Sequence, residues 1–183
     1  RENFEYRYYY AQRIGPVTAR IIEPTYRTDY PQHVDEIVVF DAEMLNTRPE
    51  DEEEQKNFTP LYGCLKTIIP TEYGESWFCE GVMPGEEQFN AFREALRERN
   101  WYYWSNSNDD YTLTDSHQGE DAEPLPALYF VISAPRSVAK ANIDKTLSEL
   151  TADWEHPLCW WRLAKEAGAN EEKHAAISER YGM

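Results

Sequence analysis

Residues 127–133 read Ala-Leu-Tyr-Phe-Val-Ile-Ser, and this stretch decides the fold around which the rest of the chain is arranged. The short apolar run is rich in aromatic and β-branched residues, which predicts a strand. Ser133 is of a residue type that caps helices, so a helix could follow it. Apolar residues at helical spacing, including Ile143 and Leu147, predict this helix over about 136–152. A strand followed directly by an amphipathic helix indicates that helices pack on a sheet.

Two further helices are predicted after this pair, over 158–167 and 170–181. Pro157 suits a first helical turn, and Gly168 suits the C-terminal end of a helix. The two helices have some helix-turn-helix character, but the second begins with two glutamates where a DNA-reading helix needs basic residues. We therefore expect an αα-hairpin whose apolar faces lie on the core.

On the N-terminal side, the clearest helix spans 85–100, with Phe89, Phe92 and Leu96 on one face. Six shorter segments have strand-like composition or alternation, and they predict strands at 3–13, 17–22, 36–40, 61–69, 76–82 and 101–104. The residues at 70–74 predict a turn that pairs the fourth of these strands with the fifth.

The order of these segments favours an α+β fold over an alternating α/β fold. We predict an antiparallel or mixed sheet from the N-terminal two-thirds of the chain, packed against about four helices of which the last three are C-terminal. Residues 1–183 are expected to form a single domain. It would be divisible into a β-rich lobe (1–104) and a mainly helical lobe (127–183), joined by a long acidic surface loop (105–126).

The charge of the chain is unusual, because 34 acids against 18 bases give a net charge of −16. Residues 29–123 contain 23 of the acids and only 6 of the bases. Such a field repels nucleic-acid phosphates and anionic membranes, and it attracts a basic protein surface. It therefore predicts a basic protein partner and no direct binding to nucleic acid or membrane. Acidity that serves only solubility is the other interpretation.

The cysteines and the apolar runs bear on location. Cys64, Cys79 and Cys159 are odd in number and widely spaced, unlike a disulfide framework. No apolar run approaches the ~18 residues that suggest a membrane span, and the first residues show no basic-then-apolar signal pattern. We expect a reducing, cytoplasmic location.

No Gly-x-Ser-x-Gly, Walker or dinucleotide-binding pattern occurs, so the sequence predicts no cofactor and favours a non-catalytic protein. Six Trp, 13 Tyr and 7 Phe accompany the acids, and Tyr and Trp are enriched at protein interfaces. A Tyr-rich sheet packed on helices explains the aromatic residues equally well.

The predicted function is that of an acidic binding protein that occludes a basic partner site. DNA-mimic proteins of the anti-restriction or anti-CRISPR type and toxin-immunity proteins fit this description, and an interaction module of a larger assembly is a further alternative. The partner-binding carboxylates would lie in a solvated loop or frayed helix at 49–57 and in the 105–126 loop. They are Glu50, Asp51, Glu52, Glu53, Glu54, Asp109, Asp110, Asp115, Glu120 and Asp121.

An alternative function comes from Asp41 and Glu43, which follow the apolar run at 36–40. Two carboxylates at a strand end can hold a divalent metal ion. Over about eight residues, this run followed by Asp-x-Glu resembles the first motif of the DnaQ-like exonucleases, which implies a metal-dependent nuclease or hydrolase. The sequence departs from that family in lacking a second acidic motif, and His117 precedes Asp121 by four positions where the family has five.

His156 and Cys159 have the spacing of a zinc-ligand pair, which Cys64 and Cys79 could join. Zinc sites of this kind usually have a second closely spaced pair, and the sequence has none. The apolar residues around Cys159 instead predict a buried core thiol.

Overall fold

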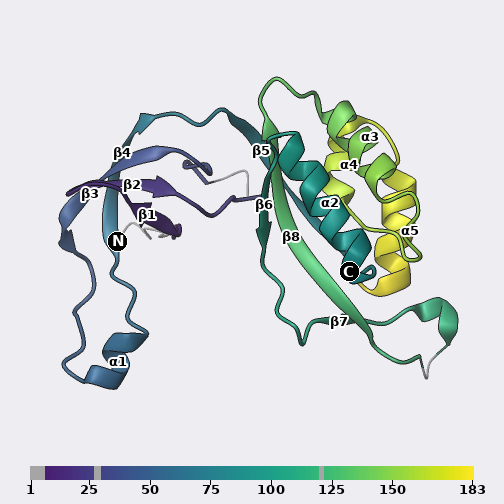
Figure 1. The fold of residues 1–183 in the computed structure, drawn as a ribbon, viewed down its shortest axis with the longest axis horizontal. Helices are drawn as coiled ribbons and strands as arrows, with labels where there is room; N and C mark the ends of the chain where they lie inside the picture. Colours follow the sequence, from purple (N-terminus) through teal and green to yellow (C-terminus); the bar gives the residue numbers. More distant parts are fainter. Residues whose placement is uncertain (1–6, 27–29, 120–121) are drawn as a thin grey trace, which may run out of the picture. The chain divides into compact units, whose positions relative to one another are not determined.

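The computed structural model describes residues 7–26, 30–119 and 122–183 (Figure 1). Contacts between residues divide the chain into two compact units. The N-terminal unit comprises Arg1–Glu23 and Asp29–Glu72, and the C-terminal unit comprises Pro24–Thr28 and Tyr73–Met183. The α+β class is confirmed, because antiparallel sheets are combined with helices of which the last three are C-terminal. A single domain over the whole chain stays a prediction.

The N-terminal unit is built on one antiparallel sheet in the order β1-β2-β3-β4. Its elements are β1 (Ala11–Arg13), β2 (Thr18–Ile21), β3 (Ile37–Met44), the short helix α1 (Glu52–Lys56) and β4 (Tyr62–Ile69). The buried apolar cluster of this sheet is small and consists of Ala19, Ile21, Val38 and Phe40. Such a small core buries little apolar surface relative to the number of residues in the unit.

Two of the predicted strands in this unit have different bounds in the structure. Only the end of the strand predicted over 3–13 forms β1, and residues 3–6 lie outside the described ranges. β3 continues past its predicted end at Phe40 to Met44, because Met44 still pairs with Tyr62 of β4. Asp41 and Glu43 therefore lie within a strand and not at its end.

The C-terminal unit contains a sheet in the order β5-β8-β6, with the short β7 also paired to β8. The strands are β5 (Tyr73–Val82), β6 (Tyr102–Ser105), β7 (Thr112–Leu113) and β8 (Leu125–Pro135). The predicted pairing of the segments 61–69 and 76–82 is wrong, because β4 pairs with β3 and β5 pairs with β8. β8 contains the run at 127–133, and pairing with this buried central strand outweighs the local turn at 70–74.

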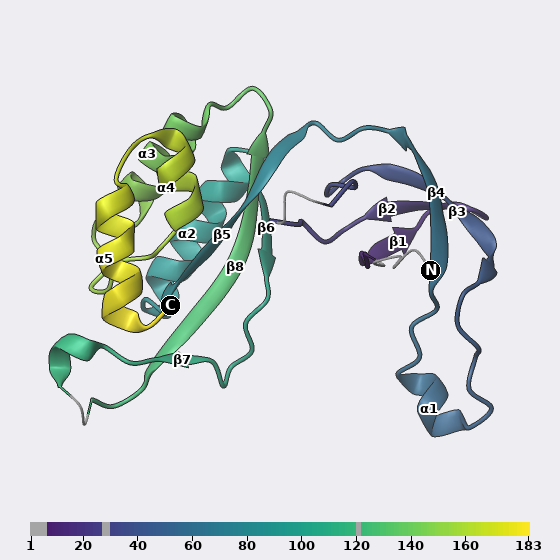
Figure 2. The ribbon, with the colours of Figure 1, turned by 180° about the vertical axis from the view of Figure 1, so that it is seen from behind.

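Four helices lie on the same face of this sheet (Figures 1 and 2). They are α2 (Glu86–Glu98), α3 (Lys140–Leu150), α4 (Trp161–Ala167) and α5 (Glu171–Tyr181). The main core lies between the helices and the sheet and includes Trp77, Phe92, Phe130, Leu147 and Trp160. The predicted αα-hairpin is confirmed, since α4 and α5 direct buried residues toward the core across the left-handed Gly168.

The helix predicted from Leu158 begins later, at Trp161. The cause is an antiparallel bridge between Cys159 and Glu80 of β5, in which each backbone N–H donates to the other residue's carbonyl at 2.7 and 2.9 Å. A residue in extended pairing cannot also lie in a helical turn. Burial of Cys159 confirms the predicted core thiol.

The segment 105–126, predicted to be a surface loop, is partly ordered into the core of the C-terminal unit. It contains β7 and a 3₁₀ turn, η1 (Ser116–Gln118). Leu113 is buried in a second apolar cluster with Ile177 and Tyr181 of α5. Among the described residues, no helix is both long and apolar enough to cross a membrane.

Candidate functional site

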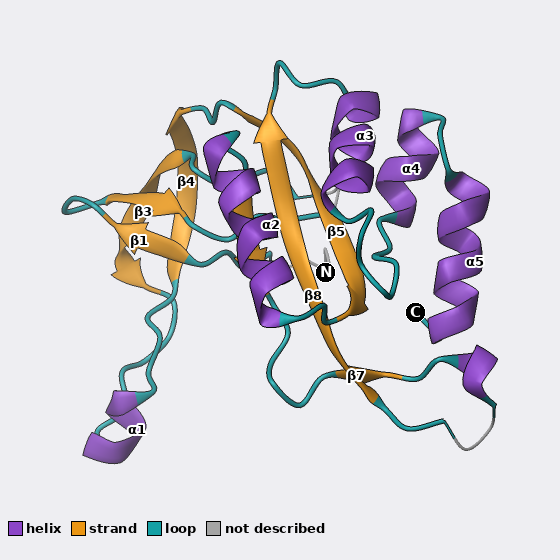
Figure 3. Ribbon diagram, turned by 45° about the vertical axis from the view of Figure 1, so that its right-hand side comes forward, coloured by secondary structure: helices purple, strands orange, loops and turns teal. Residues whose placement is uncertain are grey.

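The first predicted acidic cluster lies on a protrusion of the N-terminal unit, residues 45–61, which connects β3 to β4 and carries α1 at its end (Figure 3). Backbone and side-chain hydrogen bonds fix the base of this acidic protrusion. The Leu45 N–H donates to the Leu61 carbonyl at 2.8 Å. The Asn46 amide donates to the Thr59 carbonyl at 3.0 Å and accepts from the Leu61 N–H at 2.8 Å. The protrusion therefore leaves the sheet on a defined stem.

The end of the protrusion presents its carboxylates to solvent. Asp51 caps α1, because its Oδ1 accepts from the N–H groups of Glu53 and Glu54 at 2.9 and 3.1 Å. No residue of α1 is buried, and Glu50 to Glu54 are all exposed. Within the described parts of the chain, Glu53 alone among the five forms an ion pair, with Lys56 at 2.6 Å. Acids in a first helical turn also match the helix dipole, so this cluster is compatible with an ordered helix.

The second predicted cluster is divided by the fold. Asp109 and Asp110 are exposed, whereas the Asp115 side chain is only 2% exposed and binds Arg180 of α5 through both carboxylate oxygens. The Arg180 guanidinium lowers the pKa of Asp115 to about 2. The carboxylate of Asp115 thus serves the fold and does not face solvent. Glu120 and Asp121 lie outside the described residues.

The alternative metal pair lies on β3. Asp41 and Glu43 are both exposed, and they lie in the stretch between Phe40 and Met44 where the register with β4 is irregular. Oδ1 of Asp41 accepts from the Glu43 N–H at 3.2 Å. Within the described ranges, no group of three or more His, Cys, Asp or Glu residues comes close enough together to hold a metal ion. A hydrolase that uses these two residues stays a prediction.

His156 and Cys159 have separate partners in the structure. Nδ1 of His156 hydrogen-bonds with the Tyr181 hydroxyl at 2.9 Å, and the Cys159 thiol donates to the His174 carbonyl at 3.5 Å. Burial raises the pKa of Cys159 to about 11, so the sulfur stays protonated near neutral pH. These contacts agree with structural roles for both side chains.

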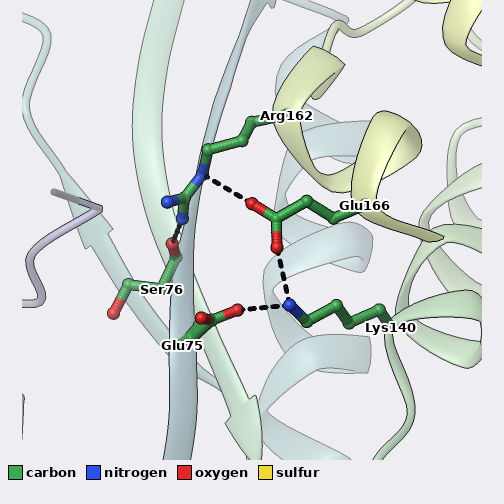
Figure 4. Close-up of polar contacts among 5 residues, drawn as sticks. All are labelled: Glu75, Ser76, Lys140, Arg162 and Glu166. Carbon is green, nitrogen blue, oxygen red and sulfur yellow. Dashed lines mark hydrogen bonds and ion pairs between the residues drawn. The ribbon is translucent and has the colours of Figure 1, made fainter. Parts of the chain in front are cut away.

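The sequence did not reveal a charged network in the C-terminal unit (Figure 4). Nζ of Lys140, on α3, lies 2.7 Å from Glu75 of β5 and 2.6 Å from Glu166 of α4. Arg162 of α4 donates to the carbonyl of Ser76 at 2.5 Å and lies 3.9 Å from Glu166. The carboxylates raise the pKa of Lys140, with Glu166 the larger cause. The network joins one strand to two helices.

Trp77 lies beneath this network and is 1% exposed. Nζ of Lys140 and Cζ of Arg162 lie 5.2 and 4.6 Å from the centre of its indole ring, within cation–π range. A pocket of about 250 Å³ adjoins Trp77 and Lys140. Because each cation contacts a carboxylate within the unit, the network is best explained as a structural brace.

One sequence signal could have located the brace. Lys140 is the first residue of α3, where the positive end of the helix dipole disfavours a cation. A lysine at that position therefore predicts a nearby carboxylate partner. The identity of that partner is not readable from the sequence, because Glu75 is distant in the chain.

Comparisons with known proteins add no assignment to these sites. No protein-family model matches the chain, and no curated protein or solved structure matches it either.

Proposed function

We propose that this chain is a non-catalytic binding protein that uses its acidic protrusion to cover a basic site on a partner protein. The observation that carries the proposal is the arrangement of Glu50 to Glu54. All five are exposed on a segment without buried residues, at the end of a hydrogen-bonded stem. Like charges in sequence repel one another, so holding them together favours a role in which a cationic surface neutralises them.

The spacing of these carboxylates supports the DNA-mimic form of the proposal. Successive residues of an α-helix rise by about 1.5 Å, and duplex DNA carries one phosphate charge per about 1.7 Å of its axis. The three acids of the first turn, Glu52 to Glu54, therefore approach the linear charge density of DNA along the helix axis. A nucleic-acid enzyme or a nuclease toxin has a basic cleft suited to such an array, which makes anti-defence and toxin-immunity proteins the classes that fit.

A capture experiment with a charge-matched control tests the proposal. The variant Glu50→Gln, Glu52→Gln, Glu54→Gln removes three charges and leaves the Asp51 cap and the Glu53–Lys56 pair intact. The control Glu86→Gln, Glu87→Gln, Glu98→Gln removes three exposed charges from α2. We expect wild type and control, but not the protrusion variant, to retain basic proteins from a host lysate at low salt and release them at high salt.

Retention of the same proteins by both variants would show that net charge alone causes capture, and the proposal would then be wrong. For any protein that is retained selectively, competition with a fluorescent DNA duplex separates the two classes. Displacement of the duplex supports a DNA mimic. Inhibition of the captured protein without displacement supports toxin immunity.

A further inference from the structure

The outer edge of the N-terminal sheet has an irregular register. β4 pairs with β3 and, within the described ranges, with no other strand. The paired residues include Ile37–Ile69, Val38–Thr67, Val39–Lys66 and Phe40–Cys64. From Ile37 to Val38, and again from Val39 to Phe40, β3 advances by one residue while the paired residue on β4 changes by two. Leu65 and Ile68 are the extra residues, so each occupies a β-bulge.

Both bulges present an apolar side chain to solvent. Leu65 is 62% exposed and Ile68 is 44% exposed, and the neighbouring Ile69 is 55% exposed. Edge strands are commonly protected by bulges and by charged side chains, and Lys66 is the one charged residue of β4. Protection of the edge would not require leucine and isoleucine at the bulged positions. We call Leu65, Ile68 and Ile69 the apolar patch.

A further exposed apolar side chain lies at the stem of the acidic protrusion. Leu45, at the stem, is 64% exposed and hydrogen-bonds through its backbone with Leu61, the residue before β4. Leu65 is three residues beyond Tyr62, a distance of about 10 Å along an extended strand. A protein interface of ordinary size could therefore cover both Leu65 and the stem that carries the carboxylates.

We propose that the apolar patch is the second part of the same interface, and that the partner presents apolar side chains beside its lysines and arginines. This inference rests on the proposed function and specifies the chemistry of the partner surface. Charge complementarity selects this occupant over a second copy of the chain, since each copy carries a net charge of −16 and an acidic protrusion in which, among the described residues, Glu53 alone of the five carboxylates forms an ion pair.

The two parts of the interface should differ in how they respond to salt. Exposed charges accelerate association and are screened by salt. Buried apolar anchors slow dissociation and depend little on salt. Substitutions in the protrusion and in the patch can therefore be distinguished by affinity measured at low and high salt.

Two synthetic peptides of equal length and charge serve as probes, one alternating Lys with Leu and the other alternating Lys with Ser. Their affinity for the full chain is measured by fluorescence anisotropy, at about 50 mM and about 500 mM salt. The patch variant is Leu65→Thr, Ile68→Thr, because threonine is β-branched and suits a strand at both positions. Ile14→Thr, at a 50% exposed position outside the patch, is the control.

We expect wild type and Ile14→Thr to bind the Lys-Leu peptide about tenfold more tightly than the Lys-Ser peptide, the effect of a buried apolar anchor. The patch variant should lose this preference and keep its affinity for the Lys-Ser peptide. An unchanged preference in the patch variant would overturn the inference, and so would a dimer of the wild-type chain that the variant abolishes. The triple Gln protrusion variant should weaken binding of both peptides, and its failure to do so would contradict the proposed function separately.

Discussion

The two units of the chain use their side chains in opposite ways. Of the eleven large apolar residues that are exposed in the described parts of the chain, nine belong to the N-terminal unit. The buried cluster of its sheet has four residues, against sixteen in the main core of the C-terminal unit. The C-terminal unit also satisfies charges internally, as Lys140 and Arg180 illustrate. The comparison indicates that the larger core lies in the C-terminal unit, and it supports our proposal that the N-terminal unit is the one that binds a partner.

The largest effect is expected from a cavity in the C-terminal core. Leu147→Ala should lower the free energy of unfolding by about 2–5 kcal/mol, because Leu147 is fully buried among aromatic residues. All six Trp residues lie in this unit, so denaturation followed by Trp fluorescence measures it selectively. Val38→Ala in the N-terminal unit is the counterpart, and it should shift the far-UV circular dichroism transition more than the fluorescence transition. Equal shifts of both signals by Val38→Ala would break the comparison and favour one cooperative domain.

A loss of intermediate size in the free energy of unfolding is expected when the pH is lowered, because His174 is buried. Burial, and secondarily Lys173, lowers the pKa of His174 to about 4, from 6.5 in an exposed histidine. Below pH 6.5 the unfolded chain binds a proton that the folded chain does not bind. Stability should therefore fall by about 3 kcal/mol as the pH is lowered from 6.5 to 4.

The measurement is the free energy of unfolding from Trp fluorescence across this pH range, in wild type and in His174→Gln. The glutamine variant should lack most of the pH-dependent loss. It should be less stable at neutral pH, because Nδ1 of His174 accepts from the backbone N–H of Trp160. An identical pH profile in both proteins would show that His174 is not the titrating group.

The smallest effect is expected at the protrusion. The triple Gln variant of Glu50, Glu52 and Glu54 should change the free energy of unfolding by no more than about 0.5 kcal/mol, because α1 buries no residue. The test is chemical denaturation followed by far-UV circular dichroism. A loss well above that value would mean that the acids support the fold, which would weaken the division of roles between the units.

The sequence predicts a strand or helix correctly where its apolar residues follow a strong pattern over a short stretch of chain. The run at 127–133 and the face formed by Phe89, Phe92 and Leu96 predicted β8 and α2 because burial imposes a periodicity on residues that are close in the chain. The acidic run at 50–54 indicated an exposed segment for the same reason, since no core can accommodate it.

Features that depend on distant partners were missed. The turn residues at 70–74 suggested a hairpin, but the partner of β5 is β8, about 50 residues further along the chain. The pairing of Asp115 with Arg180 spans 65 residues, and it converted an expected surface acid into a buried one. The bulges at Leu65 and Ile68 depend on the register with β3, which the composition of β4 does not determine.

The stem of the acidic protrusion has a consequence for evolution and engineering. Met44 and Tyr62 are paired across β3 and β4, so the protrusion begins and ends at points about 5 Å apart. A segment with adjacent ends is a cassette: it can be shortened to a tight turn, or exchanged for one of another length and charge, while the register of the sheet is kept. On the proposed function, replacing residues 45–61 would change the acidic part of the interface and leave the apolar patch on β4 in place.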